Sequence, residues 1–303
     1  MLLLCDHRGS GLSKALAPLR RAGFELETAR SLRESLERLA ARRYELVILD
    51  PLAPGGSVEL GELVRRCEEA PPTPLLLVTD PGDPRALVEA AAGLEAGPCD
   101  LVRRDASAEE FELRARRLIE RAGQLDELLD LRYRAAHDDL TDLVRPLTFQ
   151  ARLEEHFSAA ERHGLDLSLV LIDLDDFGLI NKRFDHTVGD RVLAGVARVI
   201  RESLRAEDVA GRLGGDEFGI CLPFTGALEA AATVRRLGRM IAGLSGRLDG
   251  RGEELRITAS LGFETTDGRQ VASVQELRQR AETALRRAKR AGGDRGVFYR
   301  SGA

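Results

Sequence analysis

The most restrictive feature of this sequence is an alternation of short strand-like runs with helix-like segments in its first third. The strand-like runs are Leu2–Leu4, Phe24–Thr28, Leu46–Leu49, Leu75–Val78 and Leu101–Val102. The helix-like segments between them are Ser13–Ala22, Leu32–Arg43, Val58–Cys67 and Leu87–Leu94. Short, fully apolar strands are typical of a parallel sheet that helices cover on both faces. We therefore predict that residues 1–106 form a doubly wound α/β domain of the flavodoxin-like kind.

A long helix is predicted for residues 107–137. This segment has no proline and a single glycine, Gly123. A narrow apolar stripe runs along it, formed by Leu113, Leu118, Leu125 and Leu128. Such a stripe could pair with the same helix of a second chain. The alternative is a solvated connector that packs on its own domain.

Residues 138–303 are predicted to form a second domain of the α+β class. Its strand-like segments are Leu169–Ile172, the two halves of Val209–Phe224 on either side of Gly214-Gly215, and Leu255–Phe263. Its helix-like segments are Val188–Leu204, Ala227–Leu244 and Val274–Ala291. A sheet with a central hairpin, covered by helices, is the expected result.

Composition narrows the kinds of partner. The net charge of the 303 residues is −5, so the chain has no bulk attraction for nucleic acid polymers or an anionic membrane. We find no run of apolar residues long enough to span a bilayer and no targeting signal. The four cysteines are far apart and form no metal-ligand spacing, as expected for reduced thiols. A cytoplasmic protein is expected.

Two acidic clusters carry the possible chemistry. Asp173-Leu174-Asp175-Asp176-Phe177 follows a buried apolar run, and Gly214-Gly215-Asp216-Glu217-Phe218 occupies a predicted turn. Carboxylates at strand ends suit Mg²⁺ or Mn²⁺, which are hard cations that prefer oxygen ligands and often bind substrate phosphates. If the two clusters are neighbours in the sheet, Asp173 and Asp216 would share one ion. On its own, however, a Gly-Gly-Asp-Glu turn could equally be a solvated hairpin.

The second domain resembles the GGDEF family of diguanylate cyclases, over about residues 136–300. Five further motifs support the resemblance and occur in the family's order. They are Asp138-Asp139-Leu140-Thr141-Asp142-Leu143, Asn181 with Asp190, Arg205-Ala206-Glu207-Asp208, Thr258-Ala259-Ser260-Leu261-Gly262 and Ala284-Leu285-Arg286-Arg287-Ala288-Lys289. The resemblance implies an α+β nucleotidyl-cyclase-like fold. It also implies an enzyme that condenses two GTP into cyclic di-GMP and pyrophosphate.

The resemblance assigns a role to each site residue. Asp173 and Asp216 would hold the metal with the backbone carbonyl of Leu174, and Asp216 or Glu217 would help to activate the ribose 3′-hydroxyl. The remaining substrate contacts would come from Asn181, Asp190, Lys289, Phe177 and Gly178. Asn181 and Asp190 would bind the guanine edge, and a carboxylate there would reject adenine, which lacks the matching donors. Lys289 would contact the triphosphate.

Two control devices are also implied. Each catalytic domain would hold one GTP, so two domains must face each other in a homodimer. Arg205 and Asp208, with help from Arg236, would form an inhibitory site for the product cyclic di-GMP, because arginine can clamp phosphate or a guanine edge. The alternative is a surface ion pair of little energetic weight.

Three positions depart from the family pattern. Gly178 replaces a lysine, Lys182 follows Asn181 where the family has aspartate, and Gly293 replaces an arginine expected to bind phosphate. Lys182 or Arg295 would then have to supply the missing charge. These departures favour a second hypothesis, in which the protein is a catalytically weak or inactive receptor for cyclic di-GMP.

The first domain resembles a response-regulator receiver. Asp50 occupies the position of the phosphoacceptor, with Asp6, Thr79 and Arg104 around it. Arg104 replaces the lysine that is usual in receivers, and the two cations differ in reach and hydration. The resemblance implies phosphorylation of Asp50, for which a histidine kinase would be the partner. The alternative is a receiver fold that is silent to phosphorylation.

Overall fold

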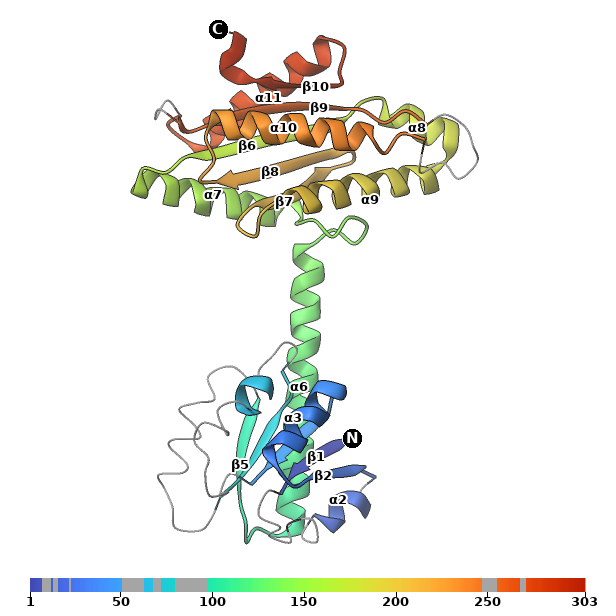
Figure 1. The fold of residues 1–303 in the computed structure, drawn as a ribbon, viewed down its shortest axis with the longest axis vertical. Coiled ribbons are helices and arrows are strands. Elements are labelled where there is room, and N and C mark those ends of the chain that lie inside the picture. Colours follow the sequence, from blue (N-terminus) through green and yellow to red (C-terminus); the bar gives the residue numbers. More distant parts are fainter. Residues whose placement is uncertain are drawn as a thin grey trace. The chain divides into compact units, whose positions relative to one another are not determined.

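The computed structural model describes residues 1–6, 12, 16–21, 23–50, 63–67, 72–79, 98–246, 255–267 and 271–302. By their internal contacts they fall into two units, Met1–Leu131 and Arg132–Ala303. Each unit contains one five-stranded sheet (Figure 1).

The sheet of the first unit is entirely parallel, and its order is β2-β1-β3-β4-β5. Its strands are β1 (Leu2–Cys5), β2 (Leu26–Ala29), β3 (Leu46–Leu49), β4 (Leu75–Thr79) and β5 (Cys99–Arg103). This is the strand order of flavodoxin-like folds. The predicted fold class of residues 1–106 is therefore confirmed.

Alternate side chains of these strands enter two separate cores. Leu2, Leu4 and Ile48 pack on one face with the helix α6 (Ala108–Ala136), and Leu3, Val47 and Leu49 pack on the other with the helix α3 (Leu32–Ala41). The helices of this unit are α2 (Ala17–Arg21), α3 (Leu32–Ala41), residues 63–67 and the first part of α6 (Ala108–Ala136). The predicted helix Leu87–Leu94, and parts of Ser13–Ala22 and Val58–Cys67, lie outside the described residues.

The long helix α6 matches its predicted range closely, but its buried face differs from the predicted stripe. The buried residues are Phe111, Ala115, Leu118 and Ala122. Of the predicted stripe, Leu113 is 49% exposed and Leu128 is 44% exposed. Spacings of four and three residues keep one side of a helix against the sheet. Leu113 lies off that side, whereas Phe111 and Ala115, which were not predicted, lie on it.

The sheet of the second unit has the order β10-β9-β6-β8-β7. Its strands are β6 (Leu167–Leu174), β7 (Val209–Gly214), β8 (Glu217–Pro223), β9 (Ala259–Thr265) and β10 (Arg295–Phe298). All pairings are antiparallel except that of β10 with β9. The predicted α+β class and the hairpin around Gly214-Gly215 are confirmed.

Helices cover both faces of this sheet (Figure 1). They are α7 (Pro146–His163), α8 (Phe177–Phe184), α9 (His186–Ser203), α10 (Ala227–Ala242) and α11 (Val274–Arg290), followed by the 3-10 helix η2 (Tyr299–Gly302). Val170 and Ile172 of β6 pack into the core that includes α9 and α10. Leu169 and Leu171 pack into the core of α7 and α11. Successive side chains of β6 point to opposite faces of the sheet, and each set packs against its own pair of helices.

The predicted strand Leu255–Phe263 starts too early, because β9 begins at Ala259. The preceding residues bond to a turn instead of to a strand. The carbonyl of Leu255 accepts a bond from the N–H of Gly246, and the N–H of Ile257 donates to the hydroxyl of Ser245. Leu255 and Ile257 are nevertheless buried.

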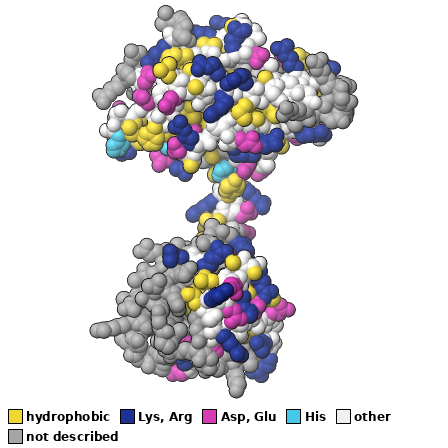
Figure 2. Space-filling model, in the orientation of Figure 1, with side chains coloured by type: hydrophobic (Ala, Val, Ile, Leu, Met, Phe, Trp, Pro, Cys, Tyr) yellow, Lys and Arg dark blue, Asp and Glu magenta, His cyan; other side chains and the backbone are white. Residues whose placement is uncertain are grey.

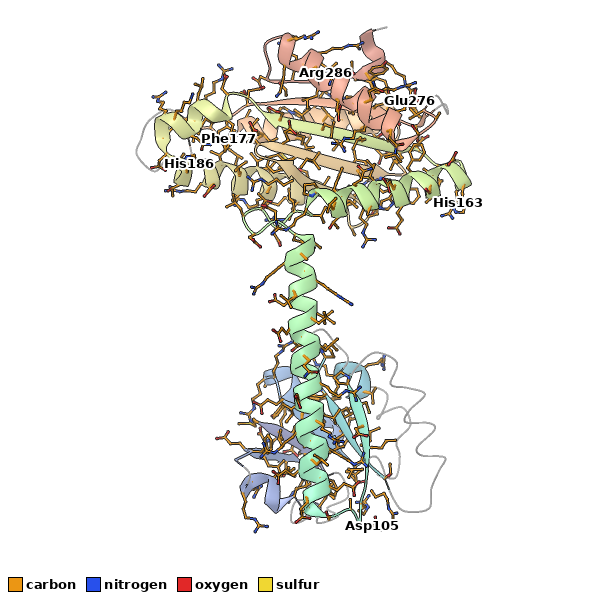
Figure 3. The ribbon with its side chains drawn as sticks, turned by 180° about the vertical axis from the view of Figure 1, so that it is seen from behind. Asp105, His163, Phe177, His186, Glu276 and Arg286 are labelled. Carbon is orange, nitrogen blue, oxygen red and sulfur yellow. The ribbon has the colours of Figure 1, made fainter. Side chains whose placement is uncertain are left out.

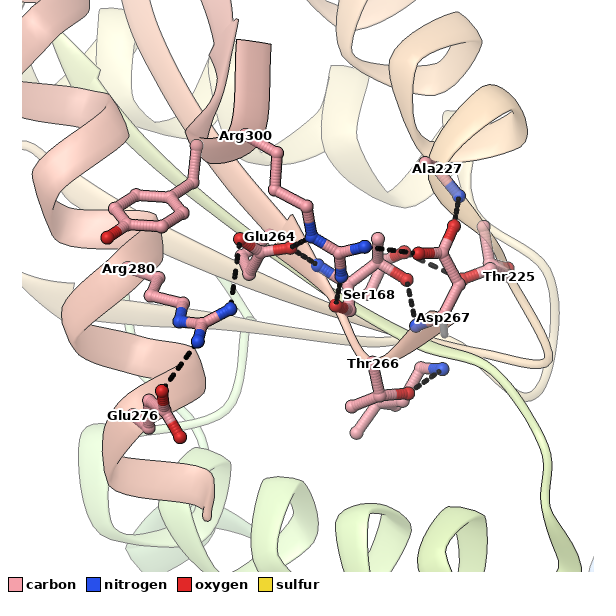
Figure 4. Close-up of polar contacts among 12 residues, drawn as sticks. Ser168, Thr225, Ala227, Glu264, Thr266, Asp267, Glu276, Arg280 and Arg300 are labelled. Atoms are coloured by element: carbon pink, nitrogen blue, oxygen red, sulfur yellow. Dashed lines mark hydrogen bonds and ion pairs between the residues drawn. The ribbon is translucent and has the colours of Figure 1, made fainter. Parts of the chain in front are cut away.

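A buried polar network anchors the C-terminal segment (Figure 4). Glu264 of β9 is fully buried and accepts from Arg300 at 2.9 Å. Arg300 also donates to Asp267 at 2.8 Å, and Asp267 in turn accepts from the N–H of Ala227 at the start of α10. Arg280 of α11 lies 3.9 Å from the second oxygen of Glu264. The network ties η2, β9, α10 and α11 together, which holds α11 in place over the sheet.

Two features of the surface bear on partners. Acidic and basic side chains are interspersed over the face that Figure 2 shows. In the described part of the chain, no helix is both long enough and apolar enough to cross a bilayer.

Candidate functional site

The two acidic clusters meet where β6 ends beside the β7–β8 hairpin. Asp173 is the residue opposite Glu217 in the register of β6 and β8. Asp216 lies in the turn between β7 and β8, and its carbonyl accepts from the N–H of Leu174 at 3.3 Å. Antiparallel pairing therefore brings Asp173, Leu174, Asp216 and Glu217 to one edge of the sheet.

Asp173 is held in a low-dielectric position. Its side chain is 8% exposed and accepts from the ammonium group of Lys289 at 2.5 Å. Burial raises the pKa of Asp173, Lys289 opposes that shift, and the charges of Asp216 and Glu217 add to it. Several negative charges around a buried carboxylate make an environment that a bound cation stabilises strongly.

The donor set fits Mg²⁺ or Mn²⁺ only if a substrate completes it. Asp173 and Asp216 offer carboxylate oxygens, and Leu174 offers a carbonyl oxygen, all of which are hard donors. Among the described residues, no group of three or more His, Cys, Asp or Glu side chains could hold a metal ion by itself. Mg²⁺ commonly binds through one or two carboxylates together with substrate phosphates. The residues present therefore fit such an ion.

Asp175 has a structural role in this arrangement. Its carboxylate accepts from Thr258 at 2.9 Å, from Ser260 at 2.7 Å and from the N–H of Asp294 at 2.8 Å. The same carboxylate fills the space beside Gly293, where an added Cβ would lie 2.8 to 2.9 Å from its atoms. Gly293 also has a φ of +71°. A side chain at Gly293 is thus excluded by both space and backbone conformation.

A cavity of about 280 Å³ opens beside the acidic residues. Its charged lining comes from Asp173, Glu217, Arg278, Glu282, Arg286 and Lys289. Three of these residues are basic and belong to α11, so the helix that the Glu264 network anchors brings positive charge to the site. Phosphate groups are the natural ligands for such a mixture of cations and metal-binding carboxylates.

The residues expected to bind guanine lie on α8 and α9. Asn181 belongs to α8, and Asp190 is exposed in the second turn of α9. Phe177, the first residue of α8, is buried, and Gly178 is exposed with no atom within 4 Å of a built Cβ. Phe177 and His186 lie at the same end of the unit in Figure 3, and α8 packs against α9. The structure places Gly189, the residue before Asp190, against the side chains of Asn181 and Phe177.

The segment between α6 and α7 is hydrogen-bonded to the Gly214-Gly215 turn, a connection that was not predicted. Asp138 accepts from the N–H and hydroxyl of Thr141 and from the guanidinium of Arg212. Arg212 also donates to the carbonyl of Gly215 at 2.8 Å. The Asp138-to-Leu143 motif was visible in the sequence, but its partner Arg212 lies far along the chain and carried no motif of its own.

A groove of about 560 Å³ contains two of the three residues of the expected inhibitory site. It is lined by Arg205 and Asp208, and by Arg152 and His156 from α7. Asp208 accepts from the N–H of Arg205 at 2.9 Å, and its second carboxylate oxygen is buried without a hydrogen-bond partner. Burial raises the pKa of Asp208.

Arg236 lies close enough to Asp208 for its charge to oppose that rise of the Asp208 pKa. Its guanidinium donates to the carbonyl of Ser203 at 2.7 Å. Arg236 is therefore a neighbour of the groove that is held from the adjacent helix α10.

The expected phosphoacceptor site lies at the carboxyl ends of the parallel strands of the first unit. Asp6, Asp50 and Thr79 are all buried there. Arg104 donates to both carboxylate oxygens of Asp50, each at 2.6 Å, and Asp50 is fully buried. A two-point contact with arginine is a strong, fixed ion pair. The loop after Asp50, Pro51–Gly55, lies outside the described residues.

Known proteins match more than half of the chain. Diguanylate cyclase DgcP of Pseudomonas aeruginosa is 35% identical over 195 residues, which are 62% of this chain and 28% of that protein. Response regulator PleD of Caulobacter vibrioides is 30% identical over 226 residues, which are 72% of this chain and 48% of that protein. The chain thus spans less than half the length of these two relatives.

The solved structures agree with the curated relatives. The coiled coil and GGDEF domain of DgcB from Caulobacter crescentus, in complex with c-di-GMP, matches with a TM-score of 0.57 and 28% identity. That match covers 62% of this chain and 99% of the solved one. Residues 135–295, more than half of the chain, match the family described as "Diguanylate cyclase, GGDEF domain". Together with the geometry around Asp173 and the Gly214-Gly215 turn, this match shows that the chain belongs to the GGDEF family of diguanylate cyclase domains.

Proposed function

We propose that this protein is a working diguanylate cyclase, which condenses two GTP into cyclic di-GMP and two pyrophosphates. The observation that carries the proposal is the grouping of Asp173, Asp216 and Glu217 at one sheet edge, with Lys289 paired to Asp173. This edge lies beside a cavity with basic residues from α11. The family supplies the reaction, and the residues present offer carboxylates for a cation and cations for phosphates.

In the proposed reaction, the 3′-hydroxyl of one GTP attacks the α-phosphorus of the other. An O3′–P bond forms, the bond from the α-phosphorus to the bridging oxygen breaks, and pyrophosphate leaves. The hydroxyl proton passes to the carboxylate of Asp216 or Glu217. Asp173, Asp216 and the carbonyl of Leu174 would hold Mg²⁺ or Mn²⁺, which would neutralise phosphate charge. The 3′-hydroxyl of the second GTP then attacks the α-phosphorus of the first, which releases the second pyrophosphate and closes the ring.

Asn181 and Asp190 would select guanine, and Lys289 would pair with the triphosphate. A carboxylate at Asp190 can accept from the N1–H and the amino group of guanine, which adenine cannot offer. Phe177 and Gly178 would line the path of the nucleotide at the start of α8. GTP is therefore the proposed sole substrate.

Each chain has one such site, so the reaction requires two copies. A twofold homodimer would present two GTP molecules to each other. Support comes from α6, on which Leu128, Leu129 and Leu131 are 44%, 44% and 56% exposed. Exposed leucines in the second half of a long helix favour pairing with another copy. The related DgcB structure comprises a coiled coil and a GGDEF domain.

Arg205 and Asp208 are proposed to bind cyclic di-GMP as an inhibitor. The unpartnered buried oxygen of Asp208 is an acceptor that a guanine donor would satisfy. The nearby charges of Arg205 and Arg236 would attract the phosphates. Binding of product there would limit further synthesis.

The first unit is proposed to regulate the cyclase as a receiver-like domain. Phosphorylation of Asp50 by a histidine kinase would have to break its two-point contact with Arg104. The opposing hypothesis, a receiver fold that does not accept phosphate, draws its support from that same contact. The two alternatives differ in what replacement of Arg104 should do.

The second candidate function is a cyclic di-GMP receptor with a weak or inactive catalytic site. It draws support from Gly178 and Gly293, where the family has basic residues. The cyclase is tested on purified protein, cleared of bound nucleotide, with GTP and Mg²⁺, and with products separated by chromatography and identified by mass. Cyclic di-GMP that disappears in Asp216→Ala supports the cyclase. No product from the wild type, with affinity for cyclic di-GMP that Arg205→Ala abolishes, supports the receptor.

A further inference from the structure

Gly189 is a buried glycine inside helix α9, directly before Asp190. Glycine in the interior of a helix is destabilising relative to alanine. Nothing in the backbone requires it, since Gly189 is not among the residues of positive φ in the described chain. The position therefore calls for a local reason.

The reason lies in the side chain of Asn181, which extends from α8 toward α9. A methyl group built on Gly189 would overlap the Oδ1 atom of Asn181 and lie 3.0 Å from its Cγ atom. It would also lie 3.3 Å from Cζ of Phe177. The carboxamide of Asn181 thus occupies the space that any other residue at position 189 would fill.

The carboxamide does not occupy that space for a hydrogen bond of its own. Its Oδ1 atom is buried and has no hydrogen-bond partner among the described residues. A buried acceptor without a donor lowers the stability of the folded state. A ligand that brings a hydrogen-bond donor to such an atom, as the edge of guanine would, stabilises the complex.

We propose that Gly189 is a positioning residue for base recognition. Because it has no side chain, it leaves room for the Asn181 carboxamide to lie against α9, one residue away from Asp190. The amide and the carboxylate then reach the same guanine edge. This inference rests on the proposed function, in which Asn181 and Asp190 bind guanine.

The test compares Gly189→Ala with the wild type in the full chain. The probe is 3′-deoxy-GTP with Mg²⁺, which lacks the attacking hydroxyl, and its Kd is measured by calorimetry. We expect Gly189→Ala to fold with an unchanged or higher Tm, since the end of the Asn181 side chain can rotate away. We expect its Kd for the probe, and its KM for GTP, to rise about tenfold with little change in kcat.

Gly238→Ala is the matched control. Gly238 is also inside a helix, α10, but a Cβ there would meet only Leu261, at an ordinary contact distance of 3.8 Å. We expect this variant to gain stability and to bind the probe like the wild type. A rise in Kd in both variants would show a general effect of helix substitution and would contradict the proposal.

Asn181→Ala and the double variant Asn181→Ala/Gly189→Ala complete a double-mutant cycle. If Gly189 acts through Asn181, the added alanine should not weaken binding further once the carboxamide is gone. The double variant also removes the overlap, so it remains informative if Gly189→Ala alone does not fold. Additive losses in Kd would contradict the proposal, as would a wild-type Kd in Gly189→Ala.

The outcomes separate this inference from the proposed cyclase function. A wild type that binds the probe but makes no cyclic di-GMP contradicts the cyclase, and the affinities of the variants still decide the role of Gly189. A wild type that makes product while Gly189→Ala keeps its affinity contradicts only the role of Gly189. A wild type that does not bind the probe contradicts both.

Discussion

The guanidinium of Arg212 lies against the carboxylate of Asp138, with 3.1 Å between Nη1 and Oδ1. The same guanidinium bonds to the carbonyl of Gly215 at 2.8 Å. One side chain therefore connects the segment that follows α6 with the turn that carries Asp216. In this way short polar contacts connect the start of the second unit to the Gly214-Gly215 turn.

Replacement of Arg212 should damage both stability and turnover. Arg212→Ala leaves Asp138 without its cation and Gly215 without a donor, which should lower the free energy of unfolding by about 1–3 kcal/mol. Arg212→Lys keeps the charge but cannot contact both partners as a planar fork, so it should recover only part of the loss. Urea unfolding and initial rates of product formation measure the two effects. A fully active Arg212→Ala would contradict the connection.

The contribution of Asp138 should depend on pH. Burial alone would raise the pKa of Asp138, but bonds from Thr141 and Arg212 lower it below its usual value. Stability from a carboxylate with a lowered pKa is fully present above the unfolded pKa of about 3.9 and is lost as the pH falls through the folded pKa. The stabilities of the wild type and of Asp138→Asn should therefore differ at pH 7 and converge as the pH falls below the lowered pKa of Asp138 in the folded state. A difference that stays constant with pH would rule out this explanation.

Gly293→Arg should not rescue a missing phosphate contact. The family arginine would have to enter at a φ of +71°, against the Asp175 carboxylate. We expect Gly293→Arg and Gly293→Ala to lose about 1–3 kcal/mol of stability and to leave the KM for GTP unimproved. Thermal unfolding and steady-state kinetics give both quantities. A stable Gly293→Arg with a lower KM would show that the loop adapts.

Arg104 should limit phosphorylation of Asp50. Its two bonds of 2.6 Å to a fully buried carboxylate occupy both oxygens that could attack a phosphoryl donor. We expect slow or undetectable labelling of the wild type by a small acyl phosphate, and faster labelling of Arg104→Lys, which makes a more flexible contact. Intact-protein mass spectrometry measures the phosphoryl group, and Asp50→Asn is the blank. Rapid labelling of the wild type would show that the ion pair is no barrier.

Loss of the proposed inhibitory site should release the enzyme from its product. Asp208→Ala and Arg205→Ala each remove a group that lines the groove of about 560 Å³. We expect progress curves of these variants to stay linear while the wild type slows as cyclic di-GMP accumulates. The Kd for cyclic di-GMP should rise by about tenfold or more, the usual consequence of losing a charged partner. Unchanged inhibition in both variants would place the product elsewhere.

The sequence predicted the elements that have strong local signals. The apolar runs of β1, β3, β4 and β6 are short, uninterrupted and buried on both faces, and the structure places each within one or two residues of its prediction. The helices α7 and α8 and the strand β10 were missed. The helix α7 is 18 residues long, whereas α8 and β10 are short, and β10 owes its place to pairing with β9 rather than to its own composition.

Long-range contacts account for what sequence patterns could not supply. Asp175 belongs to one of the two acidic clusters, yet its carboxylate accepts from Thr258 and from Ser260 of β9. Gly293 looked like a simple loss of charge, but its small size is required by Asp175. The motif residues could be recognised one by one in the sequence, whereas their pairing depends on the sheet register that brings distant segments together.

The most direct test of the account is the product balance in a reaction of purified protein with GTP and Mg²⁺. Cyclic di-GMP and pyrophosphate are measured together over time in the wild type and in Asp173→Asn, which keeps the size of the side chain but removes its charge. The account predicts two pyrophosphates for each cyclic di-GMP, and a rate that falls about a hundredfold or more in Asp173→Asn. Unchanged GTP in the wild type, or release of phosphate and GDP in place of pyrophosphate, would contradict it.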